Sequence, residues 1–302
     1  MDISLPIATQ AEAEAGTSTT VLMTPQRTAQ AIAALAPTSS GGGGSVYGRT
    51  YLTSDASLYV SASGNDTTGD GSVGNPWATV AKAYSYAQRK LDLAGERTVT
   101  CYLASDYSTN DIIEGPLVGA RGPQNFLIRG TASDNSRLHS GSIYAQNGAQ
   151  CRLNYMQVQP TGGTAVTITD GVVEFGGINI NTYGAGGIFN IVGPRSKLRM
   201  VSDCTLVGVG SCRHVFIAED HGQIEIGFAL YIAGAPSWTM AFCQGDLGGL
   251  IDGTGFSYSG GYPSGSRYTA ALNGIVWTGT GTAPANFYPG SSAGTSTGGI
   301  YA

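Results

Sequence analysis

Acidic side chains recur near one position of a repeating pattern in the second half of the chain. Asp170, Asp220 and Asp246 each precede a short apolar strand by three or four residues, and Glu219 adjoins Asp220. Two carboxylates about 5–5.5 Å apart, or about 6.5–9.5 Å apart around a water, can hydrolyse a glycosidic bond. If the strands stack as turns about 4.8 Å apart, Asp220 and Asp246 lie close together. Glu219, Asp220 and Asp246 are therefore candidate catalytic acids, although Asp in stacked turns also serves simply to form the turn.

A second group of candidate binding residues lies near the C-terminus, where aromatic residues stand among Gly, Ser and Thr with few charges. Aromatic rings can stack on sugar rings while Asn and Ser supply hydrogen bonds. The same rings could instead seal the end of a β-structure, whose bare edge needs a cover, or fill a trimer axis. The carbohydrate-binding candidates are Tyr258, Tyr262, Tyr268, Trp277 and Tyr288.

Other catalytic chemistries find little support in the sequence. His139, His214 and His221 are scattered, with no Ser or Cys nucleophile that can be placed beside them, and we expect each to be an ordinary surface or turn histidine. No acidic cluster has a spacing suited to the calcium that a polysaccharide lyase needs. The five cysteines form no CxxC pair and are expected to be buried, reduced thiols. We therefore expect no metal and no other cofactor, and a binding protein more than a hydrolase or lyase.

Composition limits the partners and the fold class. Charged residues make up 12% of the 302 residues, against about 25% in an ordinary globular protein. Gly contributes 46 residues, which favours a β-rich fibrous or solenoid protein. The net charge of -5 offers no basic surface for nucleic acid. No run of about 18 apolar residues and no charged-then-apolar leader is present, so we expect neither membrane insertion nor a secretion signal.

The N-terminal segment predicts two short helices followed by a linker. Thr9 and Glu12 have the spacing of a capping box, and Thr24-Pro25 begins a second apolar-periodic stretch. Both helices are too short to be stable alone, so they need a partner surface. Residues 38–46 are rich in Gly and Ser and predict a flexible linker.

Residues 8–35, ATQAEAEAGTSTTVLMTPQRTAQAIAAL, resemble the short attachment module of phage tail fibres and related virion appendages. The AEAEAGT and MTPxRTAQAI patterns carry this resemblance. It implies that residues 1–37 bind other virion structural proteins and that the chain forms a homotrimer on the virion surface. The residues that match the module and are expected to serve attachment are Thr9, Glu12, Met23, Thr24, Pro25 and Arg27.

From residue 150 onward, short apolar strands recur with a period of 22 to 26 residues. Each period contains three strands with alternating apolar and polar positions, which predicts a mainly β chain folded as a parallel β-helix with three strands per coil. The first strands of successive coils are Cys151-Arg152-Leu153, Val173-Glu174-Phe175, Leu198-Arg199-Met200, Ile224-Glu225-Ile226 and a degenerate Leu250-Ile251-Asp252. The second strands include Leu230-Tyr231-Ile232 and Phe256-Ser257-Tyr258, and the third include Val166-Thr167-Ile168, Val215-Phe216-Ile217 and Met240-Ala241-Phe242.

The start of this solenoid is expected near residue 59. Residues 59–84, YVSASGNDTTGDGSVGNPWATVAKAY, contain a short strand, a turn-rich loop and a Pro-Trp pair that begins an amphipathic helix. We expect the helix to cover the open end of the solenoid, with Trp77 as its plug. The stretch resembles the first motif of pectin-lyase-like β-helix proteins, YVxxxGxDxxxG followed by P(W/F)xTxxxA. That resemblance implies a right-handed parallel β-helix, and it indicates the fold more strongly than any activity.

One polar position repeats with alternating charge. Arg152, Glu174, Arg199 and Glu225 each follow the first apolar residue of their coil, so stacking would align them as a ladder on the outer face. Such a ladder serves register and solubility, with each exposed pair contributing no more than about 1 kcal/mol. The alternative is a polar strip that grips a glycan.

The expected organisation has five parts: attachment helices at 1–37, the linker at 38–46, the first β-helix segment with its covering helix at 47–95, the β-helix at 96–260 and an aromatic segment at 261–302. Together with the resemblances, it predicts a fibre or spike, on tail or head, that binds host surface polysaccharide for adsorption. Two alternatives stay open, a polysaccharide depolymerase and a purely structural connector or capsid decoration.

Overall fold

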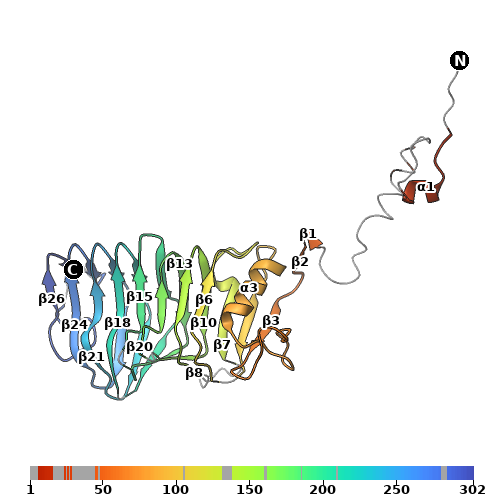
Figure 1. Cartoon of the computed structure of the whole chain (residues 1–302). Coiled ribbons are helices and arrows are strands. Elements are labelled where there is room, and N and C mark those ends of the chain that lie inside the picture. Colours follow the sequence, from red (N-terminus) through yellow and green to blue (C-terminus); the bar gives the residue numbers. More distant parts are fainter. Residues whose placement is uncertain are drawn as a thin grey trace.

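The computed structural model describes residues 6–15, 24, 26, 28, 45–46, 48–104, 106–130, 138–159, 162–184, 186–208, 210–279 and 284–302. These residues form a mainly β structure whose body is a parallel β-solenoid of about seven turns (Figure 1). Helices are few among the described residues, and those with defined bounds are α1 (Gln10–Ala15), α3 (Val80–Lys90) and the short 3-10 helix η1 (Pro123–Asn125). No helix within these ranges combines the length and the apolar character that a bilayer crossing requires.

In the described part of the chain, three parallel sheets run along the solenoid. The ten-stranded sheet contains β3 (Ala56–Val60), β5 (Val99–Leu103), β7 (Phe126–Gly130), β10 (Ala149–Asn154), β13 (Gly171–Gly176), β16 (Ser196–Met200), β19 (Gln223–Glu225), β22 (Leu250–Asp252), β25 (Ile275–Trp277) and β27 (Ile300–Tyr301). The six-stranded sheet contains β8 (Leu138–His139), β11 (Gln157–Val158), β14 (Asn179–Asn181), β17 (Cys204–Val207), β20 (Ala229–Ala233) and β23 (Ser257–Gly260). The eight-stranded sheet contains β6 (Asp111–Glu114), β9 (Ile143–Gln146), β12 (Val166–Ile168), β15 (Phe189–Val192), β18 (Ser211–Glu219), β21 (Ser237–Gly245), β24 (Ser264–Ala271) and β26 (Thr295–Thr297).

Consecutive strands of the chain belong to the three sheets in a fixed order. β13, β14 and β15 belong in turn to the ten-, six- and eight-stranded sheets, and β16, β17 and β18 repeat that order. A small separate sheet pairs β1 (Ser45–Val46) with β2 (Arg49–Tyr51) and β2 with β4 (Leu91–Asp92). The last two residues of the expected linker, 45 and 46, therefore lie in a strand.

Alternation along each strand places the core inside the solenoid. β10 alternates buried and half-buried residues along its whole length, as does β5. Parallel stacking then aligns Val173 with Leu198 and Leu198 with Ile224, so each apolar side chain packs on its counterpart one turn away. All five cysteines are buried free thiols within this core.

Aromatic rings of the eight-stranded sheet also stack on one another from turn to turn within the core. The Phe189 and Phe216 ring centroids lie 5.3 Å apart with planes only 8° from parallel. Phe175 from the ten-stranded sheet stacks on Phe189 at 4.8 Å, and Phe242 meets Phe216 edge to face at 5.5 Å. These contacts join the two sheets across the core.

The turns from the eight-stranded to the ten-stranded sheet bring backbones very close together. Asp220 and His221, then Leu247 and Gly248, take the left-handed conformation at successive turns. The next residue in the second turn, Gly249, lies so near the preceding turn that a Cβ there would fall 2.0 Å from the Ala218 carbonyl oxygen. A glycine is therefore required at this corner on steric grounds.

The loop at 61–79 organises the start of α3. The Asp66 carboxylate accepts hydrogen bonds from the backbone N–H groups of Ala78 and Thr79 and from the Thr79 hydroxyl. Thr79 is the N-cap of α3 and accepts a bond from the Lys82 N–H. The buried Trp77 ring donates to the Gly69 carbonyl at 2.8 Å. The Gly- and Asp-rich sequence of this loop thus folds around Trp77 and satisfies the free N–H groups of the helix.

The buried face of α3 packs on the first turns of the solenoid. Tyr84 meets Phe126 edge to face at 4.9 Å, and its hydroxyl donates to the Gly115 carbonyl. The Ala81 N–H donates to the buried Asp111 carboxylate, which also accepts a bond from the Tyr107 hydroxyl. Both polar and apolar contacts therefore hold this helix against β6, and Tyr84 also reaches Phe126 of β7 (Figure 1).

The charge ladder is confirmed. Register pairs Arg152 with Glu174, Glu174 with Arg199, and Arg199 with Glu225. Glu174 bonds Arg152 and lies 3.5 Å from the Arg199 guanidinium, while Glu225 accepts from Arg199 at 2.9 Å and pairs with Lys197. Glu174 is almost completely buried, so it forms the centre of the ladder and not an exposed rung.

The expected register is wrong in the last turns and at one strand. Ile251, not Leu250, pairs with Ile224, and Ser259, not Ser257, pairs with Tyr231. Phe216, not Val215, stacks beneath Phe189 in β15, a strand that the sequence pattern did not reveal. The pairing of β18 with β21 is also irregular, because β21 contains one more residue than β18 between the pairs Cys212–Trp238 and His214–Ala241, which shifts every later position of β21.

The solenoid begins where the sequence predicted, because β3 belongs to the ten-stranded sheet. It extends past the expected end at residue 260, since β24 to β27 continue two of the sheets. The degenerate apolar pattern after residue 260 concealed these later strands, because β24 (SGSRYTAA) and β26 (TST) consist mainly of Gly, Ser, Thr and Ala and show no alternation of apolar and polar residues.

Candidate functional site

A polar pocket of about 260 Å³ opens on the eight-stranded sheet. Its walls come from β15, β18 and β21 and from glycine-rich segments that precede β12 and β15. The polar side chains that line it are Asn190, Arg213, His214, Glu219 and Gln244.

Strand register aligns Asn190 and Gln244 at equivalent positions of the sheet. Asn190 pairs with Ile217, and Ile217 pairs with Gln244, so the two amides flank an apolar residue on consecutive strands. Glu219 lies two residues after Ile217 and therefore points to the same side of β18. The floor of the pocket is therefore apolar at Ile217 and is bordered by the amides of Asn190 and Gln244 and by the Glu219 carboxylate.

Several polar atoms of the pocket have no hydrogen-bond partner among the described residues. These atoms are Asn190 Oδ1, Gln244 Oε1 and both ring nitrogens of His214. His214 and Gln244 are only 5% and 7% exposed. A buried polar group without a partner costs about 1–3 kcal/mol, so a hydrogen-bonding ligand would stabilise this arrangement.

His214 is a neutral ring in this environment. Burial, assisted by the neighbouring Arg213, lowers its pKa from 6.5 to about 4. Neutral imidazole offers one donor and one acceptor. Its ring lies directly against Gly187, where a Cβ would fall 2.2 Å from His214 Nε2. Glycine at this position therefore makes room for the histidine.

Glu219 has the electrostatic character of a site carboxyl group. Burial raises its pKa, and the Asp246 charge raises it further, whereas Arg213 and a hydrogen bond from Asn190 lower it. The register that pairs Ala218 with Gly245 continues to Glu219 and Asp246, which places these two residues side by side. Perturbed carboxyl groups in a hollow are typical of functional sites.

The predicted acid pair is therefore different in the structure. We expected Asp220 to neighbour Asp246, but Asp220 lies in the adjoining left-handed turn, where it is exposed and 3.5 Å from His221. Asp170 is paired with Arg195 at 2.8 Å. The physical reason is the register of β18 and β21. Because Ala218 pairs with Gly245, Glu219 aligns with Asp246, and Asp220 aligns with Leu247 in the turn that follows.

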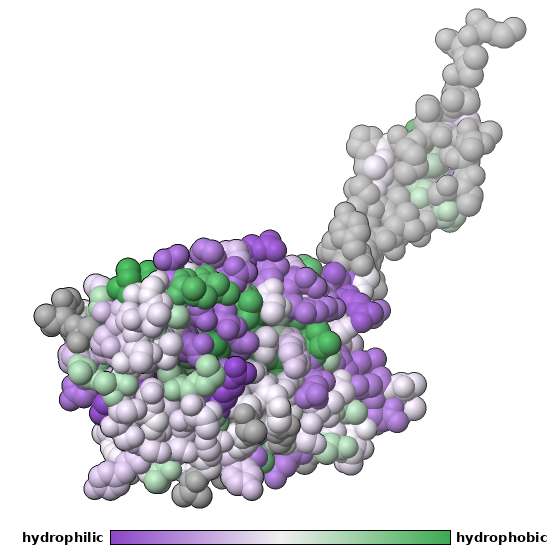
Figure 2. All heavy atoms as spheres, turned by 60° about the vertical axis from the view of Figure 1, so that its left-hand side comes forward, coloured by the Kyte–Doolittle hydropathy of each residue, from purple (hydrophilic) through white to green (hydrophobic). Residues whose placement is uncertain are grey.

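The predicted aromatic residues lie in quite different surroundings. Tyr262 is 91% exposed and Trp277 is 37% exposed. Tyr268 stacks on Tyr301 with ring centroids 3.6 Å apart, and the Tyr258 hydroxyl donates to the Asn286 carbonyl. Exposed apolar residues form small, separate patches among hydrophilic ones on the face seen in Figure 2.

Tyr288 is fully buried, so its ring packs into the core and offers no face to a ligand. Its hydroxyl donates to the Trp277 carbonyl, and its ring contacts Phe287, Phe256 and Phe242. This part of the aromatic segment closes the last turns of the core, as the alternative interpretation of these rings anticipated.

Only part of the predicted attachment segment is described. Thr9 and Glu12 form the expected reciprocal contacts, with the Thr9 N–H donating to Glu12 at 2.9 Å and the Glu12 N–H donating to the Thr9 hydroxyl. The Thr24 carbonyl accepts from the Thr28 N–H. Met23, Pro25 and Arg27 lie outside the described residues.

The sequence pattern missed Asn190, Arg213, His214 and Gln244 as site residues. A signal did exist, because Gly162-Gly163 and Gly186-Gly187 repeat one coil apart and remove side chains from one area of the surface. The expectation that all three histidines lie at the surface or in turns is wrong for His139 and His214, which are buried, whereas His221 is an exposed turn residue.

Metal binding gains no support from the described residues, since no three His, Cys, Asp or Glu side chains in them are grouped to hold an ion. No protein-family model, no curated protein and no solved structure matches the chain.

Proposed function

We propose that this chain is a virion-attached fibre or spike that binds host cell-surface polysaccharide, and that the pocket around His214 receives one sugar residue. The observation that carries the proposal is the set of buried polar atoms without partners at His214, Asn190 and Gln244. Sugar hydroxyl groups both donate and accept hydrogen bonds, so they can satisfy amide oxygens and both nitrogens of a neutral imidazole at once.

The pocket also suits a saccharide in shape and polarity. Ile217 supplies an apolar surface between the two amides, which fits the apolar face of a sugar ring. The pocket lies on the side of the solenoid, where successive turns repeat the same backbone spacing and an extended chain of sugars can follow them.

Attachment and assembly rest on the sequence. The resemblance of residues 8–35 to virion attachment modules supports docking of residues 1–37 on other virion proteins, on tail or head, and a homotrimer. The resemblance of residues 59–84 to pectin-lyase-like proteins supports a right-handed coil, and the alternating order of the three sheets supports three strands per coil. In this proposal α3 covers the first turn of the solenoid.

The test uses the purified full-length chain and capsular or envelope polysaccharides from candidate hosts, with pull-down and a reducing-end assay on the same samples. Binding without new reducing ends supports an adhesin. Gln244→Met and His214→Phe keep side-chain volume but remove the unpaired polar atoms, so each should weaken binding at least about tenfold. Tyr231→Ala, on the exposed six-stranded sheet, is the matched control.

A chain that binds no glycan, and whose Gln244→Met variant adsorbs normally to virions and hosts, would instead be a structural connector or capsid decoration. Binding that survives Gln244→Met and His214→Phe but fails in Tyr262→Ala or Trp277→Ala would move the site to the exposed aromatic residues.

One observation favours a second candidate function, a polysaccharide depolymerase. The raised pKa of Glu219 beside Asp246 is the environment of a general acid next to a second carboxylate. In that case the wild-type chain releases reducing ends, and Glu219→Gln abolishes their release while keeping glycan binding. Asp220→Asn should leave cleavage intact, because Asp220 is exposed in the adjoining turn beside His221 and, unlike Asp246, does not perturb the pKa of Glu219.

A further inference from the structure

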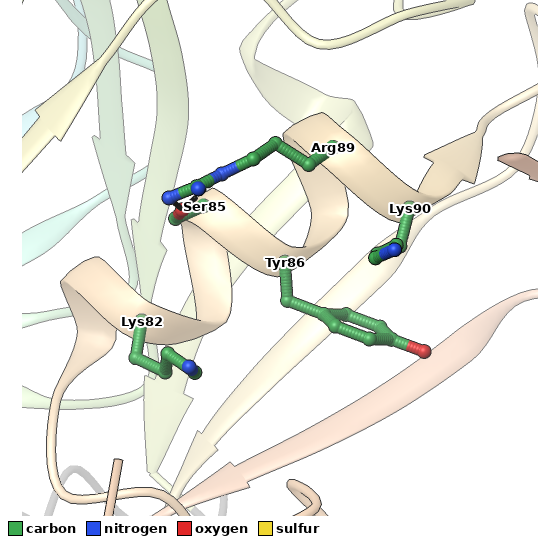
Figure 3. A pocket seen from close by; sticks show the side chains of 5 residues that line it. All are labelled: Lys82, Ser85, Tyr86, Arg89 and Lys90. Carbon is green, nitrogen blue, oxygen red and sulfur yellow. Dashed lines mark hydrogen bonds between the residues drawn. The ribbon is translucent and has the colours of Figure 1, made fainter. Parts of the chain in front are cut away.

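The outward face of α3 carries a cluster of cations around an exposed aromatic ring (Figure 3). Val80, Ala83, Tyr84 and Ala87 form the buried side of this helix, and the opposite side lines a shallow hollow of about 150 Å³. The residues that line this hollow are Lys82, Ser85, Tyr86, Arg89 and Lys90.

Helical spacing arranges these side chains in two stripes. Lys82, Tyr86 and Lys90 follow one another at intervals of four residues, which places them in line on one face. Figure 3 shows Tyr86 between the two lysines, while Arg89 turns back toward Ser85. The Arg89 guanidinium donates to the Ser85 hydroxyl, and this contact holds it on the second stripe.

No carboxylate neutralises this face within the described residues. None of the ion pairs found there includes Lys82, Arg89 or Lys90, and the helix itself contains no acidic residue. The chain as a whole carries a net charge of -5. A concentration of three cations on one helix face is therefore opposite to the average charge of the protein.

Helix stability explains only part of the cluster. Arg89 and Lys90 lie in the last turn, where the helix dipole favours cations. Lys82 lies in the first turn, where the dipole disfavours a cation. Two carboxylates lie at that end: Asp66 accepts from the N–H groups of Ala78 and Thr79 and from the Thr79 hydroxyl, and Asp111 accepts from the Ala81 N–H. Both carboxylates are bound to backbone groups of the helix start, and none of the ion pairs among the described residues joins either one to Lys82.

Tyr86 supplies a fixed aromatic surface between the two ammonium groups. Its ring is exposed, and it packs against the buried Trp77 ring with centroids 5.0 Å apart and planes at 49°. That contact orients the ring relative to the solenoid. A sugar ring stacked on Tyr86 would therefore have one ammonium group on each side.

We propose that this face of α3 binds an acidic saccharide through Tyr86, Lys82 and Lys90, with uronic-acid carboxylates as the anionic groups. Eight residues of helix separate the two lysines by about 12 Å along the axis, at about 1.5 Å per residue. A single small anion cannot reach both ends of that span, whereas an oligosaccharide with charges on separate residues can. The inference goes beyond the proposed function, because this site and the His214 pocket share no residue and each can fail alone.

The experiment measures binding of oligogalacturonate to the full-length chain by calorimetry at low and moderate salt, with neutral maltooligosaccharides and single-stranded DNA as comparison probes. We expect oligogalacturonate to bind, to weaken as salt rises, and to bind more tightly than either comparison probe. Lys82→Gln with Lys90→Gln, and separately Tyr86→Ala, should each weaken binding at least about tenfold.

The matched control is Arg121→Gln with Arg195→Gln, which removes the same charge from exposed positions elsewhere. An equal loss of oligogalacturonate affinity in the control would overturn the proposal, because it would show that binding depends on the total charge of the protein and not on the α3 face. Tighter binding of single-stranded DNA would also overturn it. The Tyr231→Ala variant, changed at an exposed residue that lines neither site, should bind oligogalacturonate as the wild type does.

Discussion

Glu219 and Asp246 lie side by side on consecutive turns of the solenoid, because the register that pairs Ala218 with Gly245 continues to them. Their proximity, together with burial, raises the pKa of Glu219. Asp220, the residue that adjoins Glu219 in sequence, lies in the turn and outside the pocket. Glu219 and Asp220 are thus neighbours in sequence, but Glu219 lines the pocket and Asp220 lies in the exposed turn.

The electrostatic coupling of this pair can be measured directly. Asp246→Asn should lower the pKa of Glu219 toward its ordinary value, because the variant removes a nearby negative charge. A carboxyl NMR titration of the folded chain measures this shift. Asp220→Asn is the matched control and should change the pKa of Glu219 much less; an equal or larger effect would contradict the register described here.

His214 should make the protein less stable in mild acid. Its folded pKa of about 4 lies below its ordinary 6.5, so the unfolded chain binds a proton that the folded chain refuses. Stability associated with this residue is therefore present above pH 6.5 and is lost as the pH falls toward 4, by up to about 3 kcal/mol. Urea unfolding of wild type and His214→Phe at pH 7.5, 6 and 4.5 tests this, since the variant should lose less stability on acidification. Parallel losses in both proteins would refute it.

Glu174 should contribute more to stability than Glu225, although both belong to the same ladder. Glu174 is nearly buried and bridges Arg152 and Arg199, whereas the Glu225 side chain is 40% exposed. Glu174→Gln leaves the Arg152 guanidinium without its charged partner and removes one of the two carboxylates beside Arg199, so it should cost about 2–4 kcal/mol. Glu225→Gln should cost no more than about 1 kcal/mol. Chemical denaturation of both variants compares them, and similar losses would show that burial does not set the contribution.

Gly249 should tolerate no side chain. A Cβ at this residue would lie 2.0 Å from the Ala218 carbonyl oxygen, so Gly249→Ala forces two turns of the solenoid apart. We expect a loss of about 2 kcal/mol or more in the free energy of unfolding. Gly74→Ala is the control, because no atom lies within 4 Å of a Cβ there. A Gly249→Ala variant as stable as the control would show that the turns are not in such close contact.

Local sequence determined much of the solenoid. Alternation of apolar and polar residues in stretches such as Ala149–Asn154 predicts which side chains face inward, because that pattern depends only on neighbours along one strand. The repeat of Arg152, Glu174, Arg199 and Glu225 predicted the ladder for the same reason, since the coils between these residues are regular.

Tertiary structure decided the site. Whether Glu219 or Asp220 meets Asp246 depends on one residue of register at a corner, and irregular pairing near Cys212 and His214 changes that count. The burial of His214 depends equally on Gly187 from the preceding turn, which no local pattern in β18 reveals. The sequence alone therefore determined the repeating turn and the ladder of alternating charges. Contacts between turns determined which buried polar groups lack hydrogen-bond partners, because such contacts join residues a whole coil apart.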